Sequence, residues 1–211
     1  MTPVSTRPPH ITLDLDAATA HLRERDPVLA ALVERVEPYR LRPQRSLFEI
    51  MLGTIVSQQL STRAADTIYG RLAAAMAPGR PRPAALLALT EAELRACGLS
   101  RSKAVYVRNV AESFVNERHT RRSFTSLEDA AVIERLTAIK GVGEWSAHMF
   151  LIFALQRPDV FPIGDLGLRK AMMQNYRLRA NAKPARFHRI ADVWRPWRSV
   201  ATLYMWRSLD G

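Results

Sequence analysis

Apolar residues recur every three or four positions along most of this chain. The clearest stripe follows Ser46 and comprises Phe48, Met51, Leu52, Ile55 and Val56. A second stripe follows Ser100 and comprises Ala104, Val107, Val110, Ala111, Phe114 and Val115. Such spacing places apolar side chains on one face of a helix. Because alternation with a period of two is almost absent and no solenoid repeat occurs, the sequence predicts an all-α fold.

Capping signals predict where several helices begin. The expected N-caps are Asp16, Asp26, Ser61, Thr90 and Ser100. Pro27 suits the first turn of a short helix that ends near Pro38. Glu93 completes a capping box with Thr90, which predicts a short helix that stops near Gly98. The segment Pro78–Pro83 is expected to be a loop.

The segment Leu136–Ala147 contains a Gly141-Val142-Gly143 turn between two helical stretches. Both glycines are expected to allow positive φ and a close approach of another backbone. The amides that open the next helix could then bind an anion, as a helix-hairpin-helix binds one DNA strand. The alternative is a tight connection between two helices without a ligand.

A carboxylate, Asp165, begins a new amphipathic helix soon after this turn. Aspartate is among the preferred N-caps, so this role is expected for it. A helix N-terminus also favours the ionised carboxylate, which suits Asp165 to stabilise positive charge or to hold a water. The two roles do not exclude each other.

Composition narrows the function classes. The chain has 211 residues, 47% hydrophobic content and a formal net charge of +11. This length supports a sizeable core, and the charge favours a polyanionic partner without separating DNA from RNA or an acidic protein. The single cysteine, Cys97, excludes an internal disulfide and a four-cysteine cluster, and is interpreted as a buried thiol. No apolar stretch approaches the ~20 residues of a membrane span, and residues 1–10 lack a signal-peptide core, so a soluble cytoplasmic protein is expected.

Several separated segments together are similar to a known family. They are Leu52–Ser61, Cys97–Ala104, the Gly141 turn with Trp145, Phe161–Asp165 and Arg195–Trp206. Over about residues 47–206 the chain resembles the helix-hairpin-helix (HhH-GPD) DNA glycosylase superfamily. Within it, the chain is similar to 3-methyladenine DNA glycosylase II, the AlkA type.

The resemblance implies a two-lobed helical fold with the active cleft between the lobes. Residues 12–45 and 157–211 are expected to form one lobe, and residues 46–156 the other, with the helix-hairpin-helix at about 128–156. Residues 1–11 are expected to be mobile. The segment before the first matching helix is too short for the N-terminal β domain of the AlkA type, which is therefore expected to be missing.

The implied function is that of a monofunctional glycosylase in base excision repair. It would bind double-stranded DNA as a monomer and hydrolyse the N-glycosidic bond of N-methylated purines. Two alternatives remain open: a non-catalytic helix-hairpin-helix DNA-binding protein, and a monofunctional glycosylase for a neutral lesion, whose pocket would want more hydrogen-bonding groups.

The catalytic residue implied by the resemblance is Asp165, facing the positive charge that develops on the deoxyribose. The implied base pocket comprises Trp145, Met149, Trp206, Gln58 and Gln59. By spacing alone Trp145, Met149 and Ile152 also fit core packing, and the glutamines could instead bond helix ends. Met149 stands where the AlkA type has tyrosine, and Gly164 where it has a second aspartate.

The DNA-binding residues implied are Lys140, Gly141, Val142, Gly143, Ser146, Leu99, Ser100 and Arg101. Either Leu99 or Arg101 would be the wedge that fills the gap left by an extruded nucleotide. No cofactor is required, but backbone carbonyls of Thr137, Ile139 and Val142 could hold Na⁺ or K⁺ at the hairpin. Because Trp145 stands where bifunctional relatives place a lysine, no Schiff base can form there.

Four C-terminal side chains complete the sequence predictions. Trp194 and Trp197 are expected to anchor the core. Arg195 and Arg198 could reach a phosphate, but a solvated position is favoured for both.

Overall fold

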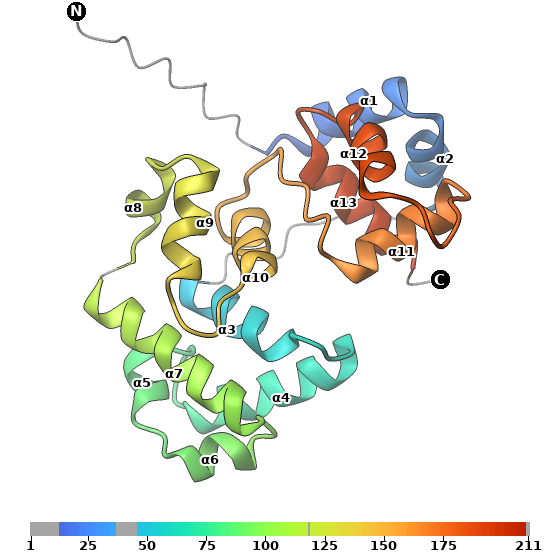
Figure 1. Cartoon of the computed structure of the whole chain (residues 1–211). Helices are drawn as coiled ribbons and strands as arrows, with labels where there is room; N and C mark the ends of the chain where they lie inside the picture. Colours follow the sequence, from blue (N-terminus) through green and yellow to red (C-terminus); the bar gives the residue numbers. More distant parts are fainter. Residues whose placement is uncertain (1–12, 37–45, 118, 210–211) are drawn as a thin grey trace, which may run out of the picture. The chain divides into compact units, whose positions relative to one another are not determined.

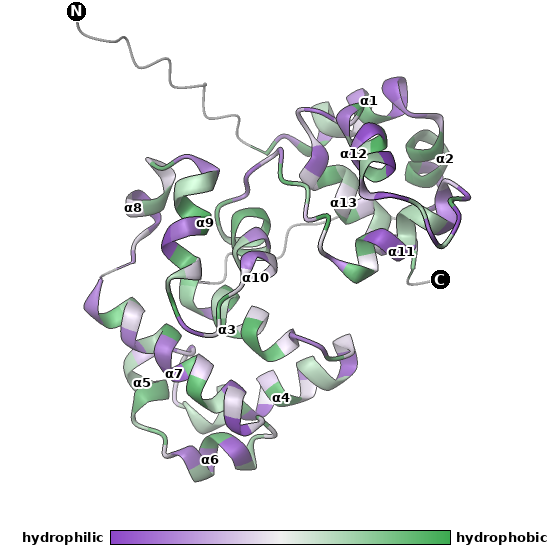
Figure 2. Cartoon of the chain, viewed as in Figure 1, coloured by the Kyte–Doolittle hydropathy of each residue, from purple (hydrophilic) through white to green (hydrophobic). Residues whose placement is uncertain are grey.

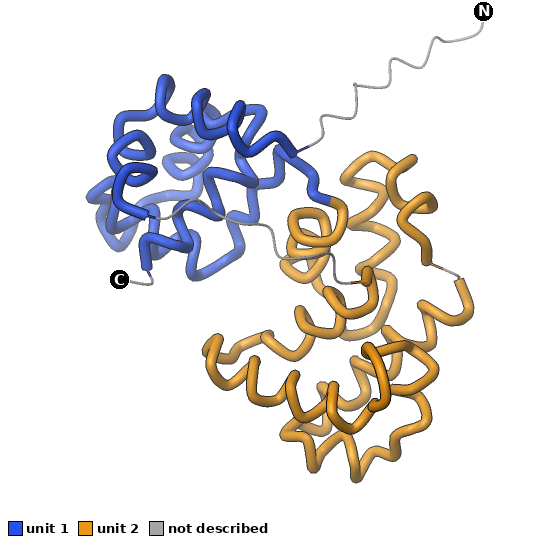
Figure 3. Tube along the Cα trace, turned by 180° about the vertical axis from the view of Figure 1, so that it is seen from behind, with its two compact units in different colours: residues 1–39, 156–211 blue, residues 40–155 orange. Residues whose placement is uncertain are grey.

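The computed structural model describes residues 13–36, 46–117 and 119–209. These residues form helices joined by turns and contain no strand, which confirms the all-α prediction (Figure 1). The chain divides into two compact units, residues 1–39 with 156–211 and residues 40–155 (Figure 3). The segment expected to be mobile, residues 1–11, lies outside the described residues.

Unit 1 is built from both ends of the chain. Its helices are α1 (Leu15–Arg25), α2 (Pro27–Arg35), α11 (Leu166–Asn175), α12 (Pro184–Asp192) and α13 (Arg198–Arg207). Helix α13 contacts α1, α2 and α11, and seven of its ten residues, Ser199–Met205, are buried. Trp194 and Trp197 are buried in the core of this unit, as predicted. Helix α13 therefore forms the centre of unit 1.

A buried carboxylate, Asp26, joins the N-terminal pair of helices to the C-terminal part of unit 1. Its Oδ1 caps α2 by accepting the N–H groups of Val28 (2.9 Å) and Leu29 (3.2 Å), as predicted. Its Oδ2 accepts the hydroxyl of Tyr176 (2.6 Å) and the indole Nε1–H of Trp194 (2.9 Å). Burial, with the nearby carboxylate, raises the pKa of the Tyr176 phenol far above its ordinary value. This network holds segments about 150 residues apart in sequence against each other.

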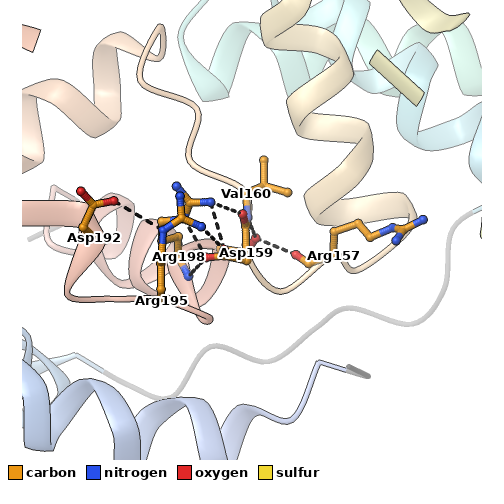
Figure 4. Close-up of polar contacts among 7 residues, drawn as sticks. Arg157, Asp159, Val160, Asp192, Arg195 and Arg198 are labelled. Carbon is orange, nitrogen blue, oxygen red and sulfur yellow. Dashed lines mark hydrogen bonds and ion pairs between the residues drawn. The ribbon is translucent and has the colours of Figure 1, made fainter. Parts of the chain in front are cut away.

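A second polar cluster fixes the segment that leads into Asp165 (Figure 4). Asp159 accepts a hydrogen bond from Nη1 of Arg195 (2.7 Å) and another from Nε of Arg198 (2.7 Å). The prediction that Arg198 is solvated is therefore wrong, because its side chain is only 14% exposed. Arg195 is half-exposed, so it contacts both solvent and Asp159. Ser199 adds bonds to the carbonyl of Arg157 and from the N–H of Val160. The start of this segment is thus attached to the beginning of α13.

Unit 2 is organised around one apolar helix. Its helices are α3 (Leu47–Ser57), α4 (Thr62–Ala75), α5 (Pro83–Leu87), α6 (Glu91–Ala96), α7 (Arg101–Asn116), α8 (Arg121–Thr125), α9 (Asp129–Thr137) and α10 (Glu144–Met149), which continues into a π-helical turn, η1 (Phe150–Ala154). Helix α3 is predominantly apolar (Figure 2), buries eight of its eleven residues, and contacts α4, α7, α10 and η1. Apolar side chains on its several sides explain why it lies at the centre of unit 2.

Most predicted helix starts are confirmed. Ser61, Thr90 and Ser100 cap α4, α6 and α7, with the capping box at Thr90 and Glu93 in place. The prediction for Asp16 is wrong, because the side chain of Asp14 caps α1 and Asp16 lies in its first turn. Helix α2 ends at Arg35, and Pro38 lies outside the described residues. Within the described ranges, no helix is both long and apolar enough to cross a membrane.

The buried His119 is expected to contribute to a pH dependence of the stability of unit 2. His119 lies between the rings of Phe114 and Phe124, and its Nε2 is 2.8 Å from Oγ of Ser113 and 3.7 Å from Glu117. Burial lowers the pKa of this imidazole below its ordinary value, and the Glu117 carboxylate only partly opposes the change. Protonation is therefore easier in the unfolded chain than in the folded one.

We expect the free energy of unfolding to fall as the pH drops below about 6.5, where the unfolded state binds the proton first. His119→Gln should flatten this dependence in the range from about pH 7.5 to about pH 5. Urea unfolding of both proteins across the range measures the effect. An identical pH slope in the variant would contradict the assignment to His119.

Candidate functional site

The helix-hairpin-helix consists of α9, the turn 138–143 and α10. Gly141 has φ +102°, and a Cβ on this residue would lie 2.2 Å from Cγ of Tyr106, so only glycine fits. Gly143 is the N-cap of α10 with φ −98°, and a Cβ added to it would meet nothing within 4 Å. The expectation of positive φ is therefore confirmed for Gly141 and wrong for Gly143, which leaves room for another backbone in front of α10.

Side chains from α3 and α7 hold this turn. The Gln58 amide, at the end of α3, donates to the carbonyl of Gly141 (3.1 Å) and to Oγ of Ser146 (3.0 Å). Asn109 on α7 donates to the carbonyl of Lys140 (2.9 Å). Gln58 thus bonds helix ends, one of the two interpretations that the sequence leaves open. Gln59 is exposed with φ +57°.

Two of the predicted DNA-binding residues of the hairpin, Ser146 and Val142, are buried. Ser146 is 1% exposed and its hydroxyl accepts the Gln58 bond, so its side chain anchors the turn instead of facing solvent. Val142 is 5% exposed, which leaves its backbone as the group that could approach a ligand. Lys140 is exposed, as a phosphate contact requires.

The predicted wedge turn connects α6 to α7. Gly98 adopts φ +106°, and the Ser100 side chain accepts the N–H of Lys103 (3.2 Å). Leu99 is buried at 4% exposure, because it packs beneath the turn. The Arg101 side chain is 83% exposed and lies 3.7 Å from Glu91. Of the two candidates, only Arg101 extends from this turn.

Asp165 and Trp206 lie together in unit 1. Oδ1 of Asp165 accepts the N–H of Leu168 (2.6 Å) as the cap of α11, and the indole Nε1–H of Trp206 (2.8 Å) on α13. Gly167 lies beside both groups, since its Cβ would be 3.2 Å from that oxygen and 3.5 Å from the indole. Neither Asp165 nor Trp206 is fully buried. The structure thus fixes a carboxylate and an aromatic face relative to each other by a hydrogen bond.

Of the predicted pocket residues, Trp145 and Met149 lie on α10 in unit 2, and the neighbouring Ile152 lies in η1. Met149 and Ile152 are buried at 5% and 2% exposure, in line with core packing, whereas Trp145 is only half-buried. His148 lies 3.9 Å from Glu144, and burial lowers the pKa of its imidazole despite that carboxylate. Of Trp145, Met149 and Ile152, Trp145 is therefore the most exposed.

The predicted cation ligands are the carbonyls at the end of α9 and in the turn. The carbonyl of Ile139 accepts the N–H of Val142 (2.9 Å), which leaves one lone pair for a ligand. Carbonyl oxygens suit hard cations. Within the described residues, no group of three or more histidine, cysteine or acidic side chains is placed to bind a metal.

Comparison with known proteins identifies the family. The model of the HhH-GPD superfamily of base excision DNA repair proteins matches residues 52–196, and the chain belongs to this superfamily. DNA-3-methyladenine glycosylase 1 of Schizosaccharomyces pombe is 32% identical over 205 residues, 94% of this chain and 89% of that protein. The membership inferred from the sequence segments is thereby confirmed.

Solved structures of related glycosylases support the same family assignment. The S. pombe 3-methyladenine DNA glycosylase Mag1, in complex with abasic DNA, matches with a TM-score of 0.83 and 31% identity over 92% of this chain and 97% of that one. The DNA-3-methyladenine glycosidase of Bacillus halodurans matches with a TM-score of 0.74 and 32% identity over 90% and 88% of the two chains.

Proposed function

We propose that this chain is a monofunctional DNA glycosylase that removes N-alkylated purines from double-stranded DNA by hydrolysing the N-glycosidic bond. The observation that carries the proposal is the hydrogen bond between Trp206 and Asp165, which places an aromatic face beside a carboxylate. A DNA-binding module without chemistry would need Asp165 only as the cap of α11 and would not need the partly exposed Trp206 beside it. The names of the related 3-methyladenine glycosylases support the same substrate class.

Trp206 would select the base. An N-alkylated purine carries positive charge, and a cation over an indole face gains roughly 0.5 to 2 kcal/mol, depending on desolvation. A normal neutral purine gains less. The hydrogen bond to Asp165 also increases the electron density of the indole, which favours a cationic base further.

Asp165 would act on the sugar. The electron pair of the C1′–N bond leaves with the base and neutralises its charge, while positive charge develops at C1′. A fixed carboxylate stabilises that charge, and it can orient the water that adds to C1′ and releases its proton. Because a cationic base needs no general acid to leave, one carboxylate suffices, and Gly164 in place of a second aspartate is compatible with this chemistry.

The product would be an intact abasic strand. By the family resemblance, Trp145 stands where bifunctional relatives have the lysine that attacks C1′, and a tryptophan supplies no amine for a Schiff base. The test is to incubate methylated duplex DNA with the protein and to measure free base and strand breaks separately. Released base with strands that break only after alkali treatment supports the proposal, whereas breaks formed by the protein alone would contradict it.

DNA would be held by electrostatics and by the hairpin. The chain carries 31 lysines and arginines against 20 acidic residues. Residues 166–191 contain seven of these basic residues and no acidic residue. The first amides of α10 would point at one strand, with Lys140 at a neighbouring phosphate. The carbonyls of Thr137, Ile139 and Val142 would hold Na⁺ or K⁺ there. We further propose that the protein acts as a monomer on damaged DNA of the nucleoid.

Arg101 would be the wedge that fills the gap left by the extruded nucleotide. We expect Arg101→Ala to lower base release from methylated duplex roughly tenfold, because unstacking and unpairing a nucleotide costs a few kcal/mol that the wedge offsets. Release from methylated single strands should be unchanged. Arg95→Ala removes the same charge from an exposed position on α6 and serves as the control. Equal losses on duplex and single strands would reject Arg101 as the wedge.

A further inference from the structure

One face of α7 supports the two parts of unit 2 that would touch DNA. Lys103, Tyr106 and Asn109 follow one another at intervals of three residues on this helix. Asn109 donates to the carbonyl of Lys140, and the Tyr106 ring lies directly against Gly141. The predicted wedge turn leads into the same helix through its cap, Ser100. The wedge turn and the hairpin therefore share one rigid element.

Lys103 is the member of this face that does not touch the hairpin. Its Nζ donates to the carbonyl of Val56 (2.7 Å) and to the carbonyl of Gln58 (2.6 Å), at the C-terminal end of α3. Such charge-assisted bonds are shorter and stronger than neutral ones. Burial lowers the pKa of the ammonium, since the group is partly withdrawn from water. The ammonium is directed at the two carbonyls at the end of α3 and remains in partial contact with water.

A continuous chain of hydrogen bonds results. The Ser100 side chain accepts the N–H of Lys103, the Lys103 ammonium holds the backbone of Gln58, and the Gln58 amide holds Gly141 and Ser146. Lysine at this position carries two of the four links, one through its backbone and one through its side chain. Every link lies within unit 2.

We propose that Lys103 is a positioning residue that fixes the wedge turn and the hairpin in register, so that strand grip and base extrusion occur together. This inference rests on the proposed function, because it assigns both turns to DNA. It predicts that loss of the ammonium separates the two events. Non-specific duplex would still bind, whereas DNA that requires both turns at once would bind less well.

The test compares wild type with Lys103→Met, which keeps the length of the side chain and removes its donors. The probes are an undamaged duplex and the same duplex with a tetrahydrofuran abasic analogue. We expect the preference for the analogue, and base release from methylated duplex, to fall about tenfold to hundredfold, as for small misplacements of reacting groups. Affinity for undamaged duplex and its salt dependence should not change.

The salt dependence separates positioning from a direct phosphate contact. Loss of a lysine that binds a phosphate would lower the slope of affinity against salt by about one. Lys103→Arg should restore most of the preference, because the guanidinium can also donate to two carbonyls. Arg108→Met is the matched control, since Arg108 on the same helix donates to the carbonyl of Leu89 (2.7 Å), outside the chain of bonds.

A second break tests the connection itself. Gln58→Leu should cause a similar loss, and the double variant with Lys103→Met should be no worse than either single variant, because one chain is broken in both. If Lys103→Met does not fold, Gln58→Leu with Lys103→Arg provides the same comparison. Multiplicative losses, a changed salt slope, or an unchanged preference in Lys103→Met would overturn the inference. A wild type that prefers the analogue but releases no base would overturn the proposed function alone, and a wild type with no preference would overturn both.

Discussion

Asp165→Asn is expected to lower the rate of base release by roughly 10²- to 10³-fold, the usual loss when a preorganised charge-stabilising group is removed. The change removes the negative charge that would oppose the developing charge at C1′. It retains the carbonyl oxygen that accepts the N–H of Leu168 and the indole of Trp206, so the cap of α11 and the position of Trp206 should persist. The measurement is release of free base from methylated duplex at enzyme excess.

Two comparisons make this prediction specific. Asp165→Ala removes the cap as well, and should also lower the melting temperature because a lost N-cap costs about 1 kcal/mol. DNA affinity should be kept in Asp165→Asn. If wild type and variant bind equally well and neither releases base, the protein is a binding module, and if the variant releases base at the wild-type rate, Asp165 is not the catalytic carboxylate.

Gly141→Ala is expected to destabilise unit 2 by roughly 2 to 6 kcal/mol. Positive φ costs a non-glycine residue about 1 to 3 kcal/mol, and overpacking typically adds about 1 to 3 kcal/mol. Here the added Cβ would lie 2.2 Å from Tyr106, within the ring and its attachment to α7. Because the turn would have to move, DNA affinity should also fall. Thermal unfolding and duplex binding measure the two effects.

Gly143→Ala distinguishes an effect on the folding of the turn from an effect on DNA binding. Its φ is −98° and its added Cβ meets no neighbour, so the loss of stability should be limited to the roughly 1 kcal/mol by which alanine is a poorer N-cap than glycine. Affinity for duplex should still fall if a DNA backbone approaches α10 there.

A second substitution tests the steric explanation for Gly141→Ala. Tyr106→Ala should recover part of the stability that Gly141→Ala loses. A double variant as unstable as Gly141→Ala alone would contradict this explanation.

The sequence predicts best what is encoded locally. The caps at Ser61, Thr90, Ser100 and Asp165 depend on a side chain three residues from its partner, and all four are present. The apolar stripe predicted after Ser46 is present on α3, and all five of its residues are buried. The turn at Gly141 can be recognised in the sequence because its positive φ requires glycine. Helix α12 is not among the predicted elements, although Pro184 in its first turn is a start signal.

Contacts between residues far apart in the sequence cannot be predicted from these local patterns. Arg198 is held by Asp159, 39 residues away, and a cation in a strongly basic chain gives no sign of a specific partner. Leu99 and Arg101 are equivalent as wedges in the sequence, because burial of Leu99 depends on the packing around the α6–α7 turn. Lys103 carries no signal in the sequence, since its carbonyl partners lie at the end of another helix.

Oδ1 of Asp165 accepts hydrogen bonds from both Leu168 and Trp206, and this limits how the substrate range of the chain could change. A replacement of Trp206 that admits other bases also removes the indole donor from the carboxylate, so selectivity and turnover would change together. Trp145 and Met149 belong to the other unit and take no part in the hydrogen bonds that Asp165 accepts from Leu168 and Trp206. Under the proposed function, a substitution at Trp206 would therefore be a less probable route to a new lesion preference than a substitution that leaves its hydrogen bond to Asp165 in place.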